Sequence, residues 1–287
     1  MADPVQRRFA ADGVELVAEE FTAGHSRGTA LLTHGGGQTR HSWKKAARTL
    51  SERGWTSITL DTRGHGDSTW APDGDYSMDA LIADLATVTT ALDQPPVLIG
   101  ASMGGVTSLV AAGEGHLVAR GLILVDVAPR IEPAGAARVR DFMTANPEGF
   151  ASLEEVADAV SAYNPHRERS ASVEGLKRNV RLRGDGRWYW HWDPALMRRE
   201  DGGDDDETRG VLNYERLQHA ARALTIPTLL VRGQQSDVVS AEGAAELVEL
   251  VPGSRFVDVQ GTGHMVAGDD NDVFTHEVLG FLDALPR

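Results

Sequence analysis

Short apolar runs rich in β-branched residues alternate along this chain with longer segments in which apolar and polar positions recur at helical spacing. The apolar runs predict strands at residues 6–9, 14–21, 30–33, 56–60, 97–100, 121–125, 228–231 and 255–259. Between them, the segment 77–92 has a serine cap followed by apolar residues three or four positions apart, at Leu81, Leu85, Val88 and Leu92. Strands separated by such helices predict an α/β fold with a mainly parallel, eight-stranded sheet flanked by helices.

The alternation breaks between residues 128 and 223, where no strand is predicted and helical segments and an aromatic cluster follow one another. We interpret this stretch as a helical cap inserted over the sheet. The predicted domains are a first part of the core at residues 1–128, a helical cap insertion at 129–223 and a second part of the core at 224–287. Within the cap, the acidic segment 200–209 has no apolar residue, so we expect a solvated loop there rather than a calcium site.

The composition narrows the class of protein. With 287 residues, of which 41% are hydrophobic, the chain has enough apolar material for one large core. Its net charge of −14 makes nucleic acid and membrane surfaces poor partners. The lack of cysteine excludes disulfides, thiolate metal sites and cysteine nucleophiles, and we find no signal sequence and no run of 18 apolar residues. We therefore expect a soluble, cytoplasmic monomer or homodimer whose partner is a small molecule.

A candidate nucleophile lies where the apolar run 97–100 meets a predicted helix. Gly100-Ala101-Ser102-Met103-Gly104 has the form G-x-S-x-G. A sharp turn from a strand into a helix brings the backbone close to its neighbours, so glycines flank the serine and its hydroxyl projects at the carboxyl edge of the sheet. The strand before this pentapeptide and the helix after it favour a nucleophile over an ordinary serine cap.

A second glycine-rich turn, His34-Gly35-Gly36-Gly37, directly follows the predicted strand at 30–33. Consecutive glycines leave backbone N–H groups free to face a developing oxyanion. A phosphate-binding loop is the rival interpretation, but the chain has no G-K-[ST] lysine and no G-x-G-x-x-G pattern followed by an acidic residue about twenty positions later. The turn is therefore better explained as an oxyanion hole.

The last third of the chain supplies a candidate base and a candidate acid. Asp237 follows the predicted strand 228–231, and His264 follows the predicted strand 255–259 in a glycine-rich loop. Both lie beyond the carboxyl ends of their strands, at the edge of the sheet where Ser102 is expected. The chain order is Ser, Asp, His.

Together these motifs resemble those of the α/β-hydrolases, and the resemblance covers nearly the whole chain outside the cap. It is carried by His34-Gly35-Gly36-Gly37, Asp61-Thr62-Arg63-Gly64-His65-Gly66-Asp67-Ser68, Gly100-Ala101-Ser102-Met103-Gly104-Gly105, Asp237 and Gly263-His264. The resemblance implies a nucleophile at Ser102 and a base at His264. It also implies an oxyanion hole made by the backbone N–H groups of Gly36 and Met103, with no cofactor or metal. The 61–68 loop resembles a structural turn of the family.

The acid of the triad has two candidates. Some members of the family place this acid at the end of the strand that here precedes Asp126. We favour Asp237, because its 27-residue separation from His264 leaves room for one helix and one strand. Asp126 is the alternative triad acid; otherwise residues 126–129 form the exit into the cap.

Serine at the elbow argues against the epoxide hydrolases and haloalkane dehalogenases of this fold, which carry aspartate there. We expect a carboxylesterase-like serine hydrolase that cleaves an ester of a small or medium, partly apolar substrate through an acyl-enzyme. Three alternatives stay open: a carbon–carbon bond hydrolase of the β-diketone type, a cofactor-free haloperoxidase or perhydrolase, and a non-catalytic small-molecule receptor on the same fold.

We expect the cap to determine the substrate specificity. Trp188, Trp190 and Trp192 fall within five residues and present large rigid surfaces to an apolar group, although the same rings can instead anchor the cap. Weaker candidates for the pocket wall are Phe142, Met143, Phe150 and Tyr163. The cap arginines that either receive a substrate carboxylate or form a solvated helix face are Arg178, Arg181, Arg183 and Arg187.

Overall fold

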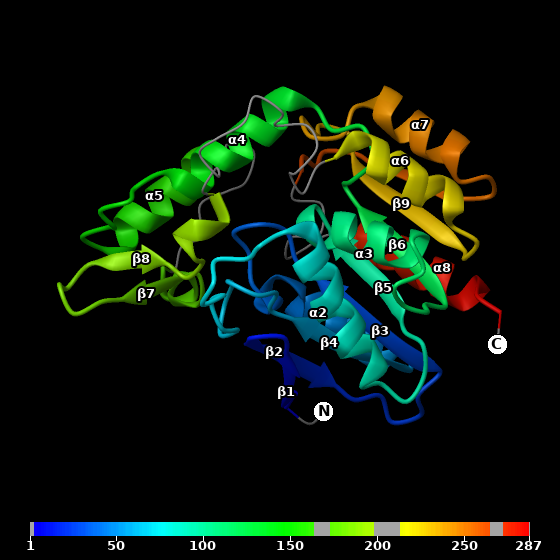
Figure 1. Ribbon diagram of the computed structural model, residues 1–287, viewed down its shortest axis with the longest axis horizontal. Helices are drawn as coiled ribbons and strands as arrows, with labels where there is room; N and C mark the ends of the chain where they lie inside the picture. Colours follow the sequence, from blue (N-terminus) through cyan, green and yellow to red (C-terminus); the bar gives the residue numbers. More distant parts are fainter. Residues whose placement is uncertain (1–2, 164–172, 198–212, 265–271, 287) are drawn as a thin grey trace.

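A single eight-stranded sheet forms the centre of the molecule (Figure 1). The computed structural model describes residues 3–163, 173–197, 213–264 and 272–286. The strands run β1-β2-β4-β3-β5-β6-β9-β10 across the sheet; β2 is antiparallel to both of its neighbours, and the remaining pairs are parallel. Their bounds are β1 Val5–Ala11, β2 Val14–Phe21, β3 Gly28–Thr33, β4 Trp55–Leu60, β5 Val97–Ala101, β6 Gly121–Val125, β9 Thr228–Gly233 and β10 Arg255–Val259.

All eight predicted strands are present, within two residues of their predicted ends. The central strands read as continuous apolar runs because both faces of a parallel sheet are covered. In β6, for example, all five residues are buried. The prediction of a mainly parallel sheet flanked by helices is therefore confirmed.

Helices cover both faces of the sheet. One apolar cluster joins the sheet to α2, α3, α6 and α7, and a second joins its other face to α1 and α8. These helices span α1 Lys44–Glu52, α2 Met78–Thr90, α3 Met103–Gly113, α6 Tyr214–Ala223, α7 Ala241–Leu250 and α8 Asp272–Ala284. The serine cap predicted for α2 is present, since Ser77 Oγ accepts a hydrogen bond of 3.2 Å from Ala80 N. No helix in the described ranges is long and apolar enough to cross a membrane.

The cap lies to one side of the sheet domain, where α4, α5, β7 and β8 group together (Figure 1). The expectation of a purely helical insertion is wrong, because β7 and β8 form an antiparallel hairpin that pairs Val180 with Trp190. Aromatic residues favour strands, and Gly184 and Gly186 fall between the two strands. The cap elements are α4 Pro133–Thr144, α5 Leu153–Tyr163, η2 Glu174–Arg178, β7 Val180–Leu182, β8 Trp188–Trp190 and η3 Pro194–Met197.

Helix α6 packs on the sheet domain, although the sequence-based boundary at residue 223 places it in the cap. Leu217, Ala220 and Ala221 of α6 belong to the same apolar cluster as α3. The two helices approach closely at Gly113, where an added Cβ would lie 2.2 Å from the backbone oxygen of Ala220. The chain has therefore returned to the core by the start of α6. The acidic segment 200–209 lies outside the described residues.

Candidate active site

Ser102 sits in a sharp turn between β5 and α3. Its backbone has φ 45° and ψ −117°, a conformation that costs a non-glycine residue roughly 1–3 kcal/mol. The flanking glycines make the turn possible: an added Cβ at Gly100 would lie 2.5 Å from the backbone oxygen of Gly104, and one at Gly104 would lie 2.6 Å from Thr33 Oγ1. The local backbone thus has the geometry that the G-x-S-x-G pattern predicts.

The glycine-rich turn after β3 lies beside this serine. An added Cβ at Gly35 would be 3.2 Å from Ser102 Cβ, so the two turns are in contact. The N–H of Gly104 donates to the carbonyl of His34 (3.2 Å), which ties the turn to the first residues of α3. Residues 34–37, called the oxyanion loop from here on after the role predicted for them, include Gly36, and the elbow includes Met103. The structure therefore brings the turn that holds Gly36 into contact with the elbow that holds Met103, and their role as oxyanion donors stays a prediction.

His264 forms a hydrogen bond with Asp126 and not with Asp237. Its Nδ1 lies 2.7 Å from Asp126 Oδ2; the imidazole is 7% exposed and the carboxylate is fully buried. The favoured acid, Asp237, instead forms a two-point ion pair with Arg138 of α4, at 2.5 and 2.7 Å. His264 is therefore paired with Asp126, the alternative acid, and the prediction that Asp237 pairs with His264 is wrong.

Local backbone geometry explains this choice. β6 and β9 are adjacent strands, so Asp126 and the loop that carries Asp237 leave the sheet side by side. Asp126 has φ 50°, and its Oδ1 accepts a hydrogen bond of 2.9 Å from the N–H of Gly233 at the end of β9. The Arg138 guanidinium holds the pKa of Asp237 below its usual range, which matches a carboxylate committed to a surface ion pair.

Part of the cap rests on the oxyanion loop. An added Cβ at Gly36 would be 3.1 Å from Met143 Sδ, and one at Gly37 would be 3.4 Å from the ring of Trp192. The indole N–H of Trp192 donates to the backbone oxygen of Met143 (3.2 Å) and joins the two. Met143 is only a weak candidate in the sequence, yet its Sδ lies closer to this loop than the ring of Trp192 does.

Most of the predicted cap aromatics pack on one another. Phe142 stacks on Tyr163 with ring centroids 4.2 Å apart, and Trp190 stacks on Trp192 at 4.7 Å. Phe142 also meets Trp190 at 5.3 Å, which joins the two pairs into one cluster. Trp188 is apart from these ring contacts and forms a β-bridge with Phe150. The cluster fits the interpretation that these rings pack within the cap. That some of them also line a pocket stays a prediction.

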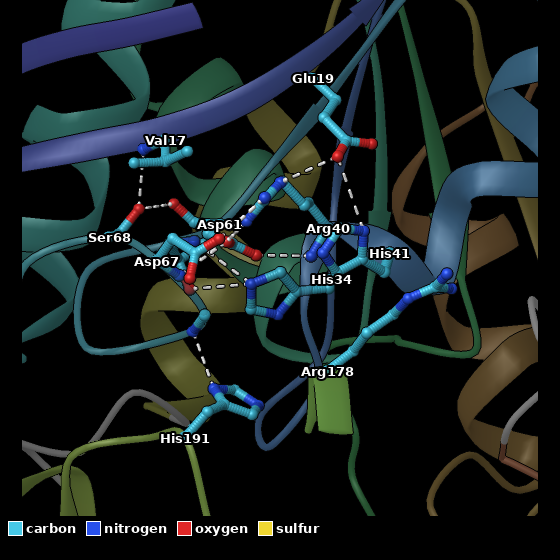
Figure 2. Close-up of polar contacts among 12 residues, drawn as sticks. Val17, Glu19, His34, Arg40, His41, Asp61, Asp67, Ser68, Arg178 and His191 are labelled. Atoms are coloured by element: carbon cyan, nitrogen blue, oxygen red, sulfur yellow. Dashed lines mark hydrogen bonds and ion pairs between the residues drawn. The ribbon is translucent and has the colours of Figure 1, made fainter. Parts of the chain in front are cut away.

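Three of the four cap arginines are held by the protein itself. Arg181 donates to the carbonyl of Gly66 (3.1 Å) and to Asp67 (2.8 Å). Arg187 donates to two backbone carbonyls of the loop before α5. Arg183 lies over the ring of Tyr189, 4.1 Å from its centroid. Arg178 is exposed and extends towards His41 (Figure 2). A role for these arginines in binding a substrate carboxylate stays a prediction.

The loop at residues 61–68 follows β4 and contacts Arg40, which lies just before α1. Asp61 is fully buried and lies within a ring of donors (Figure 2). Its Oδ1 accepts from the backbone N–H of Arg40 (2.6 Å), and its Oδ2 accepts from the N–H of Asp67 (2.9 Å) and pairs with the Arg40 guanidinium. Ser68 closes the loop by donating to the Asp61 carbonyl (2.7 Å). This loop has the structural role that the resemblance implies.

The same loop takes part in a row of three buried imidazoles. The rings of His34 and His65 have centroids 5.0 Å apart, and those of His65 and His191 are 5.8 Å apart. His65 Nε2 accepts the N–H of Gly37 (3.2 Å), and His191 Nδ1 accepts the N–H of Gly66 (2.7 Å). Burial lowers the pKa of His34 to about 4 and that of His65 to about 3, and it lowers the pKa of His191 well below its ordinary value. All three rings are therefore neutral at pH 7, and they link the oxyanion loop to the cap.

The alpha/beta hydrolase fold family matches residues 30–270 of this sequence. The chain belongs to this family. The match spans both parts of the core and the cap between them, and it includes Ser102, Asp126 and His264.

Relatives of this alpha/beta hydrolase include esterases and related hydrolases. Esterase Rv0045c of Mycobacterium tuberculosis is 29% identical over 91% of this chain and 84% of that protein. A 2-(acetamidomethylene)succinate hydrolase of Mesorhizobium japonicum is 29% identical over 82% of this chain and 81% of that protein. The crystal structure of an E-2-(acetamidomethylene)succinate hydrolase superposes with a TM-score of 0.83 at 24% identity and covers 98% of this chain and 100% of its own. These similarities support a hydrolase on this fold.

Several residues at the site escaped sequence reasoning. Arg138 lies on the cap helix α4 and contacts Asp237. Ser236 lies in the loop after β9 and contacts Asp126. His65 belongs to the 61–68 motif, which resembles a structural turn in the sequence. The available signal was position, because both the 61–68 loop and Ser236 follow a strand at the carboxyl edge of the sheet. Residue type alone does not separate them from ordinary turn residues.

Proposed function

We propose that this alpha/beta hydrolase is a serine esterase for small or medium, partly apolar carboxylic esters, with Ser102 as nucleophile, His264 as base and Asp126 as the orienting acid. The observation that carries the proposal is the 2.7 Å hydrogen bond between His264 Nδ1 and the fully buried Asp126. A carboxylate on Nδ1 fixes the tautomer of the imidazole and leaves Nε2 to act on the serine hydroxyl.

In the acylation step, His264 removes the proton of the Ser102 hydroxyl while Oγ attacks the ester carbonyl carbon. The carbonyl oxygen becomes an oxyanion, which the N–H groups of Gly36 and Met103 stabilise. When the tetrahedral intermediate collapses, the imidazolium returns its proton to the departing alcohol. Asp126 stabilises the imidazolium throughout and keeps its own charge.

In the deacylation step, His264 takes a proton from water, and the hydroxide formed attacks the acyl-serine. The tetrahedral intermediate collapses to the carboxylic acid, and the His264 imidazolium returns its proton to Ser102 Oγ, which restores the hydroxyl. The contacts of Met143 and Trp192 with the oxyanion loop support a substrate site walled by the cap next to the reacting carbonyl. Both walls are apolar, which supports a partly apolar acyl or alcohol group.

The test is hydrolysis of p-nitrophenyl esters from acetate to decanoate by wild type, Ser102→Ala, Asp126→Asn and Asp237→Asn. We expect kcat to fall by about 10⁴-fold or more in Ser102→Ala and by roughly 10³–10⁴-fold in Asp126→Asn. Asp237→Asn should keep kcat within about fivefold of wild type, since its carboxylate pairs with Arg138.

Equal losses in Asp126→Asn and Asp237→Asn would show that the acid is assigned wrongly. If wild type turns over no ester of the series, the esterase proposal fails. Diketone cleavage, perhydrolysis and ligand binding without turnover are then the reactions to assay.

A further inference from the structure

The hydroxyl of Ser236 contacts the acid of the proposed triad. Ser236 lies in the loop between β9 and α7, and its Oγ is 2.6 Å from Asp126 Oδ2. This is the oxygen that also lies 2.7 Å from His264 Nδ1. Two donors therefore meet on one carboxylate oxygen, while the N–H of Gly233 binds the other (2.9 Å).

The direction of the Ser236 hydrogen bond follows from its other partners. Its Oγ accepts the backbone N–H groups of Val238 and Val239, both at 3.1 Å. A hydroxyl has one proton, and a carboxylate can only accept. The two N–H groups occupy the acceptor side of Oγ, so its proton is directed to Asp126. The turn thus holds the hydroxyl in one orientation.

The loop that presents Ser236 is in turn held by the cap. Asp237, the next residue, forms the two-point ion pair with Arg138 of α4. Gly135 in the first turns of α4 lies against the same backbone, since an added Cβ there would be 2.2 Å from the carbonyl oxygen of Asp237. Two independent contacts therefore fix this loop against helix α4.

We propose that Ser236 is a positioning residue that locks the Asp126 carboxylate and, by donating to the oxygen shared with His264, limits how strongly this carboxylate holds the imidazolium. The Arg138–Asp237 ion pair keeps the hydroxyl in place. The proposal rests on the proposed function, because it assumes that Asp126 and His264 act together on Ser102. It assigns to the loop after β9 a supporting role in place of the acid that the sequence suggested there.

Without the Ser236 hydroxyl, Oδ2 of Asp126 accepts from His264 alone. The imidazolium is then stabilised more strongly, so the acidic limb of the pH–rate profile moves to higher pH. The carboxylate is also freer to turn, which lowers kcat. In the described residues, the charged groups that interact with His264 include Asp126 and, further out, Asp237, whose charge is compensated by Arg138.

The experiment compares wild type, Ser236→Ala and Ser236→Thr in hydrolysis of p-nitrophenyl butyrate from pH 5 to 9. Ser240→Ala is the matched control, because Ser240 lies in the same loop and caps α7 through Gly243 N (3.1 Å) without contacting Asp126. We expect Ser236→Ala to lower kcat about tenfold, with KM within twofold, and to move the acidic limb upward by about half a pH unit. Ser236→Thr, which keeps the hydroxyl, and Ser240→Ala should keep kcat within about threefold and leave the limb in place.

An unmoved limb in Ser236→Ala overturns the proposal, as does an equal loss of kcat in Ser236→Ala and Ser236→Thr, which is the result of a purely structural role. A second readout does not depend on turnover: the downfield proton NMR signal of His264 Nδ1–H, assigned by its loss in His264→Asn. It should move further downfield in Ser236→Ala. If this signal moves while wild type cleaves no ester, the proposed function fails and the positioning role stands; if it does not move, the positioning role fails.

Discussion

The neutral histidines between the oxyanion loop and the cap make a quantitative prediction about stability in acid. Burial lowers the pKa of His34 to about 4 and that of His65 to about 3, against an ordinary value of 6.5 that the unfolded chain retains. Between these values the unfolded state binds a proton that the folded state does not. The free energy of unfolding is therefore not reduced by these two histidines above pH 6.5. It falls as the pH is lowered from 6.5 towards their pKa values in the folded state.

The size of this loss follows from proton linkage. One proton corresponds to about 1.4 kcal/mol per pH unit once the pH is well below 6.5. From pH 7.5 to pH 5, a histidine with a folded pKa of about 3 or 4 therefore lowers the free energy of unfolding by about 2 kcal/mol. His65→Gln removes one such group, so the variant should lose about 2 kcal/mol less than wild type over this range, whatever its stability at pH 7.5.

Urea unfolding followed by tryptophan fluorescence, at pH 7.5, 6.5, 5.5 and 5, measures this difference. His276→Gln is the control, because the His276 side chain is 85% exposed on α8 and should leave the pH dependence as it is in wild type. Equal slopes in wild type and His65→Gln below pH 6.5 would refute the argument that a buried, neutral imidazole is maintained at this position.

Three further predictions concern contacts of the cap and of the helices. Met143→Ala should move the optimum of the p-nitrophenyl ester series to longer acyl chains, because it removes the side chain nearest Gly36; an unchanged optimum would place Met143 outside the acyl site. Gly113→Ala should lower the free energy of unfolding, measured in urea, by about 2–3 kcal/mol, because α3 meets α6 at Gly113. Gly280→Ala is the control: Gly280 has open space around it, so the substitution should raise the free energy of unfolding by about 0.5–1 kcal/mol. Arg138→Ala should lower the free energy of unfolding by less than about 1 kcal/mol, because both partners of its ion pair are more than a third exposed. A larger loss would show that the ion pair stabilises the attachment of the cap to the core.

The sheet was predictable because its central strands are buried on both faces. Continuous apolar runs such as 121–125 end at glycine or aspartate, and this signal needs no knowledge of the neighbouring strands. The elbow was predictable for a similar reason, since close backbone approach at Gly100 and Gly104 excludes every side chain. In both cases the constraint acts within a few residues of the chain.

The acid was not predictable from spacing. Asp126 and Asp237 both follow strands, and those strands are neighbours, so each carboxylate lies near the same part of the sheet edge. The choice depends on direction: a positive φ turns Asp126 towards Gly233 N and Ser236 Oγ, and Arg138 draws Asp237 away. These partners are 99 to 110 residues distant in sequence from the groups they contact.

The cap hairpin was missed because three-residue strands give little periodicity. β7 and β8 each contain only three residues, and in the sequence the β8 run Trp188–Trp190 indicates an aromatic cluster in a helical region. Pairing between the strands, which fixes Arg181 opposite Tyr189, is a property of both segments together. A single run of sequence does not reveal it.

The way the cap is attached makes it an exchangeable module. Its entry is fixed just before α4, where Glu132 N donates to Val238 O (2.9 Å) and Pro133 starts the helix. Its exit is marked by Asn213, whose side chain caps α6 on the core. We therefore expect that a different cap can replace residues 133–212 while Asp126 and α6 stay with the sheet domain. A grafted cap without an arginine at the position of Arg138 leaves Asp237 without the ion pair that it forms here.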